Sequence, residues 1–163
     1  MLRVAFTGYR PDKLPFFGED DPLFADLLSR IREQIIKLIK DGAQNFISGM
    51  ALGCDTYCAE IVLELQKQYP NITLTAAIPC ADQASRWSKA QQEHYYELLE
   101  KCNDRTVLAE HYFKGCMQKR NRYLVDNCDV LLAVYDGKSG GTMNTVNYAA
   151  GIGRKTIIIP PVL

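Results

Sequence analysis

Apolar residues recur along this chain in two alternating patterns. Short runs are apolar throughout, as in buried parallel strands. In the longer segments between them, apolar residues recur at every third or fourth position, as on one face of an amphipathic helix. Leu27, Ile31 and Ile35 illustrate the helical pattern. The short runs predict strands at residues 2–7, 44–47, 71–78, 106–109, 129–135 and 155–159.

The longer segments predict a helix between each pair of strands. Pro22 in the first turn and Gly42 after the last turn are typical of a helix start and end. Alternating strands and helices of this kind favour a parallel sheet covered on both faces, with right-handed crossovers. We therefore expect a Rossmann-like three-layer α/β/α sandwich with a mainly parallel sheet, as a single domain over residues 1–163. The helices are expected at residues 22–40, 55–69, 89–101, 116–127 and 142–150.

The amino-acid composition indicates which classes of binding partner are disfavoured for this protein. Lys and Arg together number 19, as do Asp and Glu, so the formal net charge is zero. This balance disfavours a nucleic-acid partner, although a local basic patch could still bind one. No apolar run approaches the roughly 20 residues that span a bilayer, so no membrane association is expected. The N-terminus runs directly into the first strand without a signal-peptide pattern, which indicates a cytoplasmic protein.

The six cysteines are expected to be reduced thiols. Cys54 and Cys58 have no second Cys or His pair at metal-ligand spacing, so no metal site is predicted. Without a secretory signal, disulfides are not expected either.

A glycine loop at residues 48–55 carries the first candidate site. It joins a predicted strand to a helix, and such a junction presents unpaired N–H groups to an anion. Gly49 and Gly53 permit close backbone approach, and Ser48 adds a hydroxyl. Asp55 is either a ligand contact or only the N-cap of the helix, and the whole loop is also compatible with an ordinary β–α turn.

Two further loops follow predicted strands. In a parallel sheet the loops after the strands meet at one edge, near the topological switch point. Arg10 and Arg120 are candidates for bidentate phosphate contacts. Neither a Walker A loop nor GxGxxG is present. We expect a nucleotide-like ligand and no obligatory cofactor. The candidate contacts in the two loops are Gly8, Tyr9 and Arg10, and then Asp136, Gly140, Gly141 and Thr142.

These residues resemble the YpsA-like branch of the SLOG superfamily, which includes the DNA-processing protein DprA and the cytokinin-activating LOG proteins. Gly8-Tyr9-Arg10 is similar to the Gly-x-Arg of DprA-like proteins. The run from Ser48 to Asp55 resembles their SGxAxGxD motif. Met117-x-x-Arg120, followed by Gly141-Thr142, is similar to the LOG motifs. The resemblance covers nearly the whole chain and implies a Rossmann-like fold with a nucleotide-derived ligand.

LOG proteins cleave an N-glycosidic bond, and this chain differs from the LOG motifs at positions that support that reaction. Thr145 stands at the position of the LOG glutamate, and Gln118 and Asn121 replace the His and Lys around Arg120. The departure favours a binding or sensing module. An N-glycosidase with a relocated carboxylate and a DprA-like single-stranded DNA binder are the alternatives. A homodimer is compatible by analogy with the superfamily.

An N-glycosidase without the LOG glutamate would need a catalytic carboxylate from another loop. The candidate carboxylates in that case are Asp55, Glu60 and Asp136, of which Asp55 at the helix start is preferred; Arg120 is a further catalytic candidate. Glu60 lies about 140° around the helix from Asp55, so the two do not share a face. A solvated or ion-paired helix residue is the more ordinary role for Glu60. Trp87 and Tyr95 are expected in the core in preference to a stacking platform.

Overall fold

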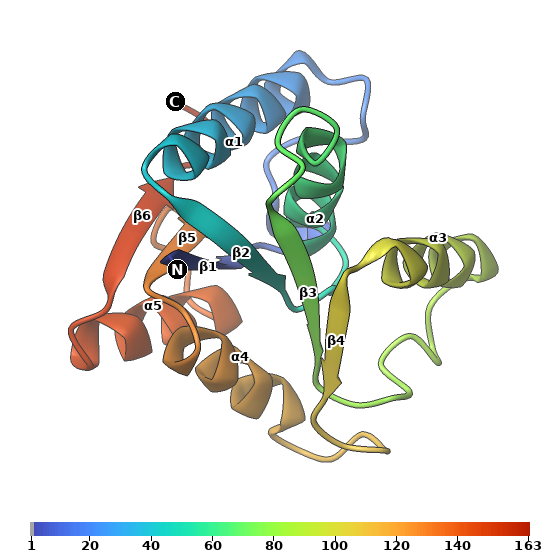
Figure 1. The fold of residues 1–163 in the computed structure, drawn as a ribbon. Coiled ribbons are helices and arrows are strands. Elements are labelled where there is room, and N and C mark those ends of the chain that lie inside the picture. Colours follow the sequence, from blue (N-terminus) through green and yellow to red (C-terminus); the bar gives the residue numbers. More distant parts are fainter. Residues whose placement is uncertain (1) are drawn as a thin grey trace.

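The computed structural model describes residues 2–163 as one sheet between two layers of helices (Figure 1). The elements in chain order are β1 (Leu2–Gly8), the 3-10 turn η1 (Pro11–Lys13), α1 (Pro22–Lys40), β2 (Ala43–Ser48), α2 (Cys54–Leu65), β3 (Thr73–Ile78), α3 (Lys89–Lys101), β4 (Asp104–Val107), α4 (Cys116–Asp126), β5 (Val130–Val134), α5 (Gly141–Gly151) and β6 (Lys155–Ile159).

All neighbouring strands pair in parallel, in the order β4-β3-β2-β1-β5-β6. The predicted Rossmann-like three-layer sandwich is therefore confirmed. The chain builds outward from β1 to β4, returns across the sheet, and continues through β5 to β6. The reversal places the topological switch point between β1 and β5, where loops after adjacent strands diverge and leave a crevice.

Three elements differ from the sequence prediction by two or more residues at an end: α2, β4 and β3, which begins at Thr73 and not at residue 71. The helix predicted over residues 55–69 begins one residue earlier and ends at Leu65, and turns follow it. The strand predicted over residues 106–109 lies two residues earlier, at Asp104–Val107. Its position is set by pairing with β3, in which Thr75 faces Asp104 and Ile78 faces Val107. Among residues 2–163, no helix combines the length and apolar character that crossing a membrane requires.

The two helical layers pack on the sheet with very different side chains. Helices α1, α2 and α3 cover one face, where Phe6, Phe46 and Leu132 point into the larger core. Helices α4 and α5 cover the other face, where small residues such as Ala5 and Ala77 alternate with them along the strands. Because alternate strand residues face opposite sides, the same strands supply both cores. The sheet surface beneath α4 and α5 therefore combines Ala5 and Ala77 with the larger Ile47 and Leu131.

Candidate functional site

A cavity of about 290 Å³ opens at the carboxyl ends of β1 and β5, at the switch point. Its wall combines the loop after β1, the glycine loop before α2, one face of α4 and the start of α5. The lining residues are Thr7, Gly8, Tyr9, Arg10, Asp12, Lys13, Ala51, Asp55, Met117, Arg120, Asn121, Gly141 and Thr142.

Arg120 reaches this wall from α4 and is only 3% exposed. Its Nη1 donates to the Gly49 carbonyl at 2.6 Å, and its Nε donates to Asn121 Oδ1 at 3.0 Å. Within residues 2–163 no carboxylate lies within 4.0 Å of its guanidinium. Burial lowers the pKa of Arg120, and the charge of Asp55 partly opposes that effect. The side chain is therefore a buried cation without a direct counter-ion.

Asp55 supplies the cavity's buried carboxylate and is 7% exposed. Its Oδ2 accepts a hydrogen bond from the backbone N–H of Ala51 at 3.3 Å. Burial raises the pKa of Asp55, and the charges of Arg120 and Arg10 and the Ala51 bond act in the opposite direction. Of the two roles open for Asp55, the N-cap role is wrong, because Gly53, with φ of 90°, is the N-cap of α2 and Asp55 lies in the first turn.

Ser48, Gly49 and Gly53 of the glycine loop do not line the cavity and lie behind its wall, whereas Ala51 lines it. Ser48 is fully buried, and its hydroxyl donates to the Asp55 carbonyl at 2.9 Å and accepts from Met50 N–H at 3.1 Å. A side chain at Gly49 would collide with the Arg120 guanidinium. A Cβ at Gly53 would lie 2.6 Å from the Tyr9 carbonyl. These residues shape the loop that positions Asp55 and Arg120.

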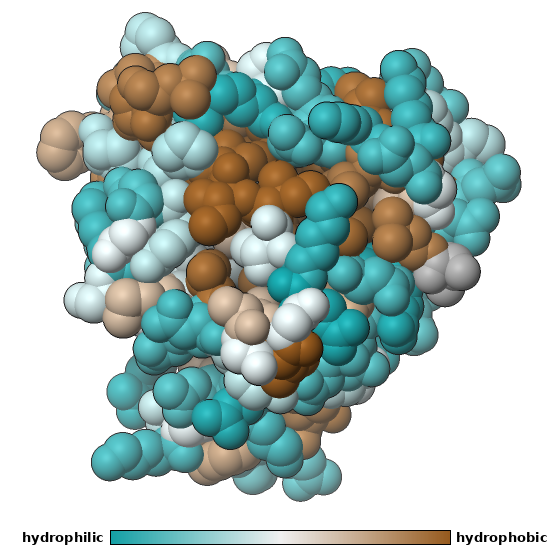
Figure 2. Space-filling view, turned by 90° about the vertical axis from the view of Figure 1, so that its left-hand side faces the viewer, coloured by the Kyte–Doolittle hydropathy of each residue, from teal (hydrophilic) through white to brown (hydrophobic). Residues whose placement is uncertain are grey.

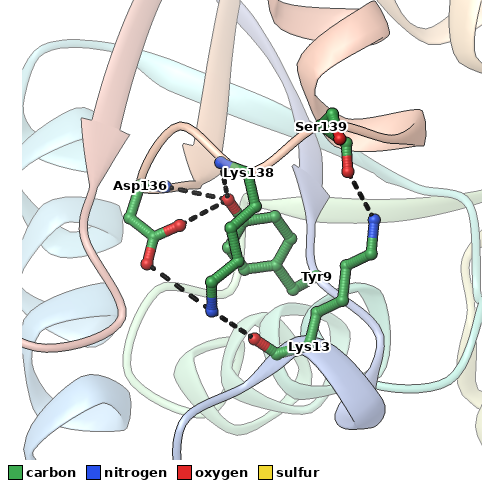
Figure 3. A network of polar contacts seen from close by, with 5 residues as sticks. All are labelled: Tyr9, Lys13, Asp136, Lys138 and Ser139. Atoms are coloured by element: carbon green, nitrogen blue, oxygen red, sulfur yellow. Dashed lines mark hydrogen bonds and ion pairs between the residues drawn. The ribbon is translucent and has the colours of Figure 1, made fainter.

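A polar network joins the loops after β1 and β5 (Figure 3). The Tyr9 hydroxyl donates to Asp136 Oδ1 at 2.6 Å and accepts from the backbone N–H groups of Asp136 and Lys138 at 3.1 and 3.0 Å. Two lysines then cross between the loops. Lys13 Nζ donates to the Ser139 carbonyl at 2.7 Å, and Lys138 Nζ donates to the Lys13 carbonyl at 3.1 Å. The network fixes the loop that leads into α5.

The network also decides which predicted residues face the cavity. The Asp136 side chain is engaged by Tyr9 and does not line the cavity, and Gly140 lies behind Lys13, whose ammonium occupies the space of a side chain there. Gly141 and Thr142 at the start of α5 do line it.

Sequence reasoning missed several lining residues, of which Thr7, Asp12, Lys13 and Asn121 have polar side chains. Lys13 lies in an irregular segment without periodicity, so no pattern singled it out. Asn121 stands at the position of the LOG lysine, and that substitution by itself gives no sign of a ligand contact.

Glu60, a candidate catalytic carboxylate, and Thr145, which stands at the position of the LOG glutamate, do not line the cavity. The Glu60 carboxylate contacts His94 Nε2 at 3.2 Å on the outer side of α2. Thr145, at the LOG glutamate position, is 3% exposed, and its hydroxyl donates to the Gly141 carbonyl of its own helix at 2.8 Å. As expected, Trp87 and Tyr95 pack with the larger core, with ring centroids 5.1 Å apart. Among residues 2–163 no group of three His, Cys, Asp or Glu side chains is placed to hold a metal ion.

Comparison with protein families gives one match over most of the chain. The YpsA model, described as the YspA SLOG family, matches residues 4–152. A UPF0398 protein of Bacillus pumilus is 30% identical over 144 residues, which cover 87% of this chain and 77% of the relative. A UPF0398 protein of Bacillus cereus is 28% identical over 152 residues, covering 92% and 83%.

Solved structures share the fold at lower identity. DNA processing protein A (DprA) from Helicobacter pylori, in a study of its single-stranded DNA binding mode, superposes with a TM-score of 0.65 and 21% identity, covering 98% of this chain and 65% of that one. DprA from Streptococcus pneumoniae gives a TM-score of 0.68 and 20% identity, covering 98% and 50%. This chain thus corresponds to part of each DprA protein.

Proposed function

This chain belongs to the YpsA family of SLOG proteins, and we propose that its cavity binds a nucleotide or nucleotide-derived small molecule through a phosphate group. The observation that carries the proposal is Arg120, a buried guanidinium that lines the cavity without a carboxylate within 4.0 Å among residues 2–163. A buried cation is costly unless an anion compensates it. A phosphate would supply that compensation.

The other residues of the cavity wall would make two kinds of contact with the ligand, one to its phosphate and one to its sugar. Arg10 and the backbone N–H groups at the start of α5, around Gly141 and Thr142, would share the phosphate with Arg120. Asp55, with its carboxylate on the same wall, would accept a bond from a ribose hydroxyl. A volume of about 290 Å³ is at the small end for ligand sites and suits a sugar phosphate with its base extending outward.

The first test is thermal unfolding against nucleoside monophosphates, nucleoside diphosphates and ADP-ribose-type compounds. A ligand present at about 100 times its dissociation constant stabilises a protein by about 2.7 kcal/mol. We expect at least one phosphate-bearing compound to raise the unfolding temperature. Arg120→Lys and Arg10→Ala should weaken that shift, because each removes a guanidinium from the cavity wall. Arg122→Ala, an exposed arginine on the same helix, should keep it.

Failure of every compound to shift the unfolding temperature would contradict the proposal. So would an unchanged shift in folded Arg10→Ala and Arg120→Lys proteins. Circular dichroism of each variant separates lost binding from lost folding, since Arg120 also donates to the Gly49 carbonyl.

Glycosidic cleavage is the alternative that Asp55 favours, because it is the buried carboxylate on the cavity wall. Thr145 cannot take that role, since its hydroxyl is bonded to the Gly141 carbonyl. Incubating the bound compound with the protein and separating base from ribose phosphate tests this reaction. If the wild type releases the base and Asp55→Asn binds the compound without releasing it, the protein is an enzyme that uses Asp55. If the wild type releases no base, the binding or sensing function stands.

Single-stranded DNA binding is a further candidate, favoured by the fold shared with DprA and by exposed cations placed over aromatic rings. Lys119 Nζ lies 6.0 Å from the Phe113 ring centroid, and the Arg122 guanidinium lies 5.4 Å from that of Tyr148. A labelled oligonucleotide should then bind with an affinity that falls steeply as salt increases. Absence of binding at low salt would remove this candidate.

A further inference from the structure

The strand β6 (Lys155–Ile159) forms one edge of the sheet, and its outer side has no strand partner among residues 2–163. Edge strands are usually protected by charges, prolines or bulges. The opposite edge, β4, has Asp104 and Arg105 among its four residues. After Lys155, β6 continues with one threonine and three isoleucines. Figure 2 faces this side of the molecule and shows apolar surface framed by polar residues.

The pairing of β6 with β5 determines which N–H and C=O groups of β6 point out of the sheet without a strand partner. The N–H of Tyr135 donates to the carbonyl of Ile159 at 3.0 Å, so this carbonyl points inward, toward β5. In a parallel ladder, alternate residues direct both backbone groups to the same neighbour. Ile157 therefore also points inward, whereas the N–H and C=O groups of Thr156 and Ile158 point out of the sheet edge.

The chain after β6 does not cover this edge. The Arg30 guanidinium, on α1, donates to the carbonyls of Pro160 and Pro161 and holds the tail against that helix. Pro160 also lacks an N–H, so pairing outside β6 ends there. The Ile158 side chain stays 49% exposed beside the bare backbone groups.

We propose that two copies of this chain pair antiparallel through β6, about a two-fold axis at Ile157, so that their sheets become continuous. This axis places Thr156 opposite Ile158 of the second copy. Both residues present outward-facing N–H and C=O groups, as a hydrogen-bonded antiparallel pair requires. The two Ile157 side chains meet at the axis on the α1 side.

The charge pattern selects a second copy in this orientation. Antiparallel pairing sets Lys155 beside Ile159 of the second copy, so the two lysines lie at opposite ends of the contact. Parallel pairing in register would align the lysines, and like charges directly opposite are destabilising. The edge is thus complementary to itself under two-fold rotation, as an isologous interface must be.

Light scattering after size-exclusion chromatography tests the proposal on the full chain. The wild type should have twice the 18.4 kDa monomer mass. Ile158→Lys, which adds a charge at a half-exposed position of the contact, should halve the mass while the circular dichroism spectrum stays native. Val107→Lys, at a similarly exposed position on β4, is the matched control and should remain dimeric.

Hydrogen exchange identifies the contact itself. The Thr156 and Ile158 amides should be protected in the wild type and exchange rapidly in Ile158→Lys. A monomeric wild type across a dilution series would overturn the proposal, as expected if β6 pairs instead with a different protein. A dimer that survives in Ile158→Lys, or one whose Thr156 and Ile158 amides exchange rapidly, would overturn it as well, because the copies would then meet elsewhere.

Discussion

At the scale of single residues, Arg120 and Asp55 are buried on one cavity wall, opposite in charge, and yet not in direct contact. Each lowers the cost of burying the other, as the opposing effects on their pKa values show. The gap between them is the place where a ligand with both an anionic group and a hydroxyl would be held. Under the proposed function, the cost of burying these two charges in the empty protein would be offset when the ligand binds.

Asp55 should give stability an unusual pH dependence. Because its pKa in the folded protein is raised above the ordinary value of 3.8, it contributes stability that is fully present below that value. This contribution is lost as pH rises through the raised pKa. We predict that Asp55→Asn gains stability relative to the wild type as pH increases from about 4 to about 8, measured by urea unfolding.

Asp129 is the matched control with the opposite sign. The backbone N–H of Arg3 donates to its carboxylate at 2.7 Å and lowers its pKa. Its contribution is therefore present above its ordinary pKa and lost as pH falls. Asp129→Asn should therefore lose stability relative to the wild type as pH rises through this lowered pKa to about 4, and the difference should then stay level up to about pH 8. Equal slopes for the two variants would contradict the environments described for both carboxylates.

At the scale of elements, the shape of the cavity depends on hydrogen bonds between the loop after β1 and the loop after β5. Tyr9 carries a single hydroxyl that bonds three groups of the loop after β5, and it is 1% exposed. Lysines from both loops then reach across to carbonyls on the other side (Figure 3). The start of α5 is thus positioned by β1, not only by the strand that precedes it in the chain.

Removing this hydroxyl should loosen the β5 loop. Tyr9→Phe leaves the N–H groups of Asp136 and Lys138 without their acceptor, so we expect a loss of about 1–3 kcal/mol in unfolding free energy. Any phosphate ligand found in the thermal screen should also bind more weakly. Tyr135→Phe is the control, because Tyr135 packs beside Tyr9 at 6.0 Å between ring centroids and has no hydroxyl bond among residues 2–163. Equal losses in both variants would count against the network.

At the scale of the whole molecule, the two faces of the sheet serve different purposes. The core under α1, α2 and α3 is the larger one, whereas the smaller core under α4 and α5 places Ala5 and Ala77 beside Ile47 and Leu131. Ala77 has a small side chain at this layer, and Arg120 Nη1 of α4 approaches the Ala77 carbonyl of β3 at 3.5 Å. The depth of this layer therefore sets the position of the buried cation in the cavity.

Thickening the layer should disturb the cavity. Ala77→Val adds two methyl groups to a fully buried position under α4, so we expect a loss of about 1–3 kcal/mol in unfolding free energy and weaker ligand binding. Leu132→Met, a volume-conserving change on the opposite face of the sheet, should cost less than about 1.5 kcal/mol and leave binding unchanged. Equal effects on binding would show that layer depth does not control the site.

The sequence by itself determined the architecture and the region of the site. Its alternating apolar periods specify which segments are strands and which are helices, because each element must bury its apolar face. Parallel strands then place the loops after β1, β2 and β5 at the same edge. Gly8, Arg10, Asp55 and Gly141 were predicted on that basis, and Arg120 as a phosphate-binding guanidinium; all five lie on the cavity wall.

Only the tertiary structure decided which polar groups have partners. Arg120 contacts the Gly49 carbonyl across 71 residues, and Lys13 reaches Ser139 across 126. Such contacts depend on how layers pack and not on local periodicity, which explains why Lys13 was missed and why Ser48 and Gly49 proved to lie behind the wall. The bare edge of β6 is of the same kind, since strand order arises from packing the whole chain.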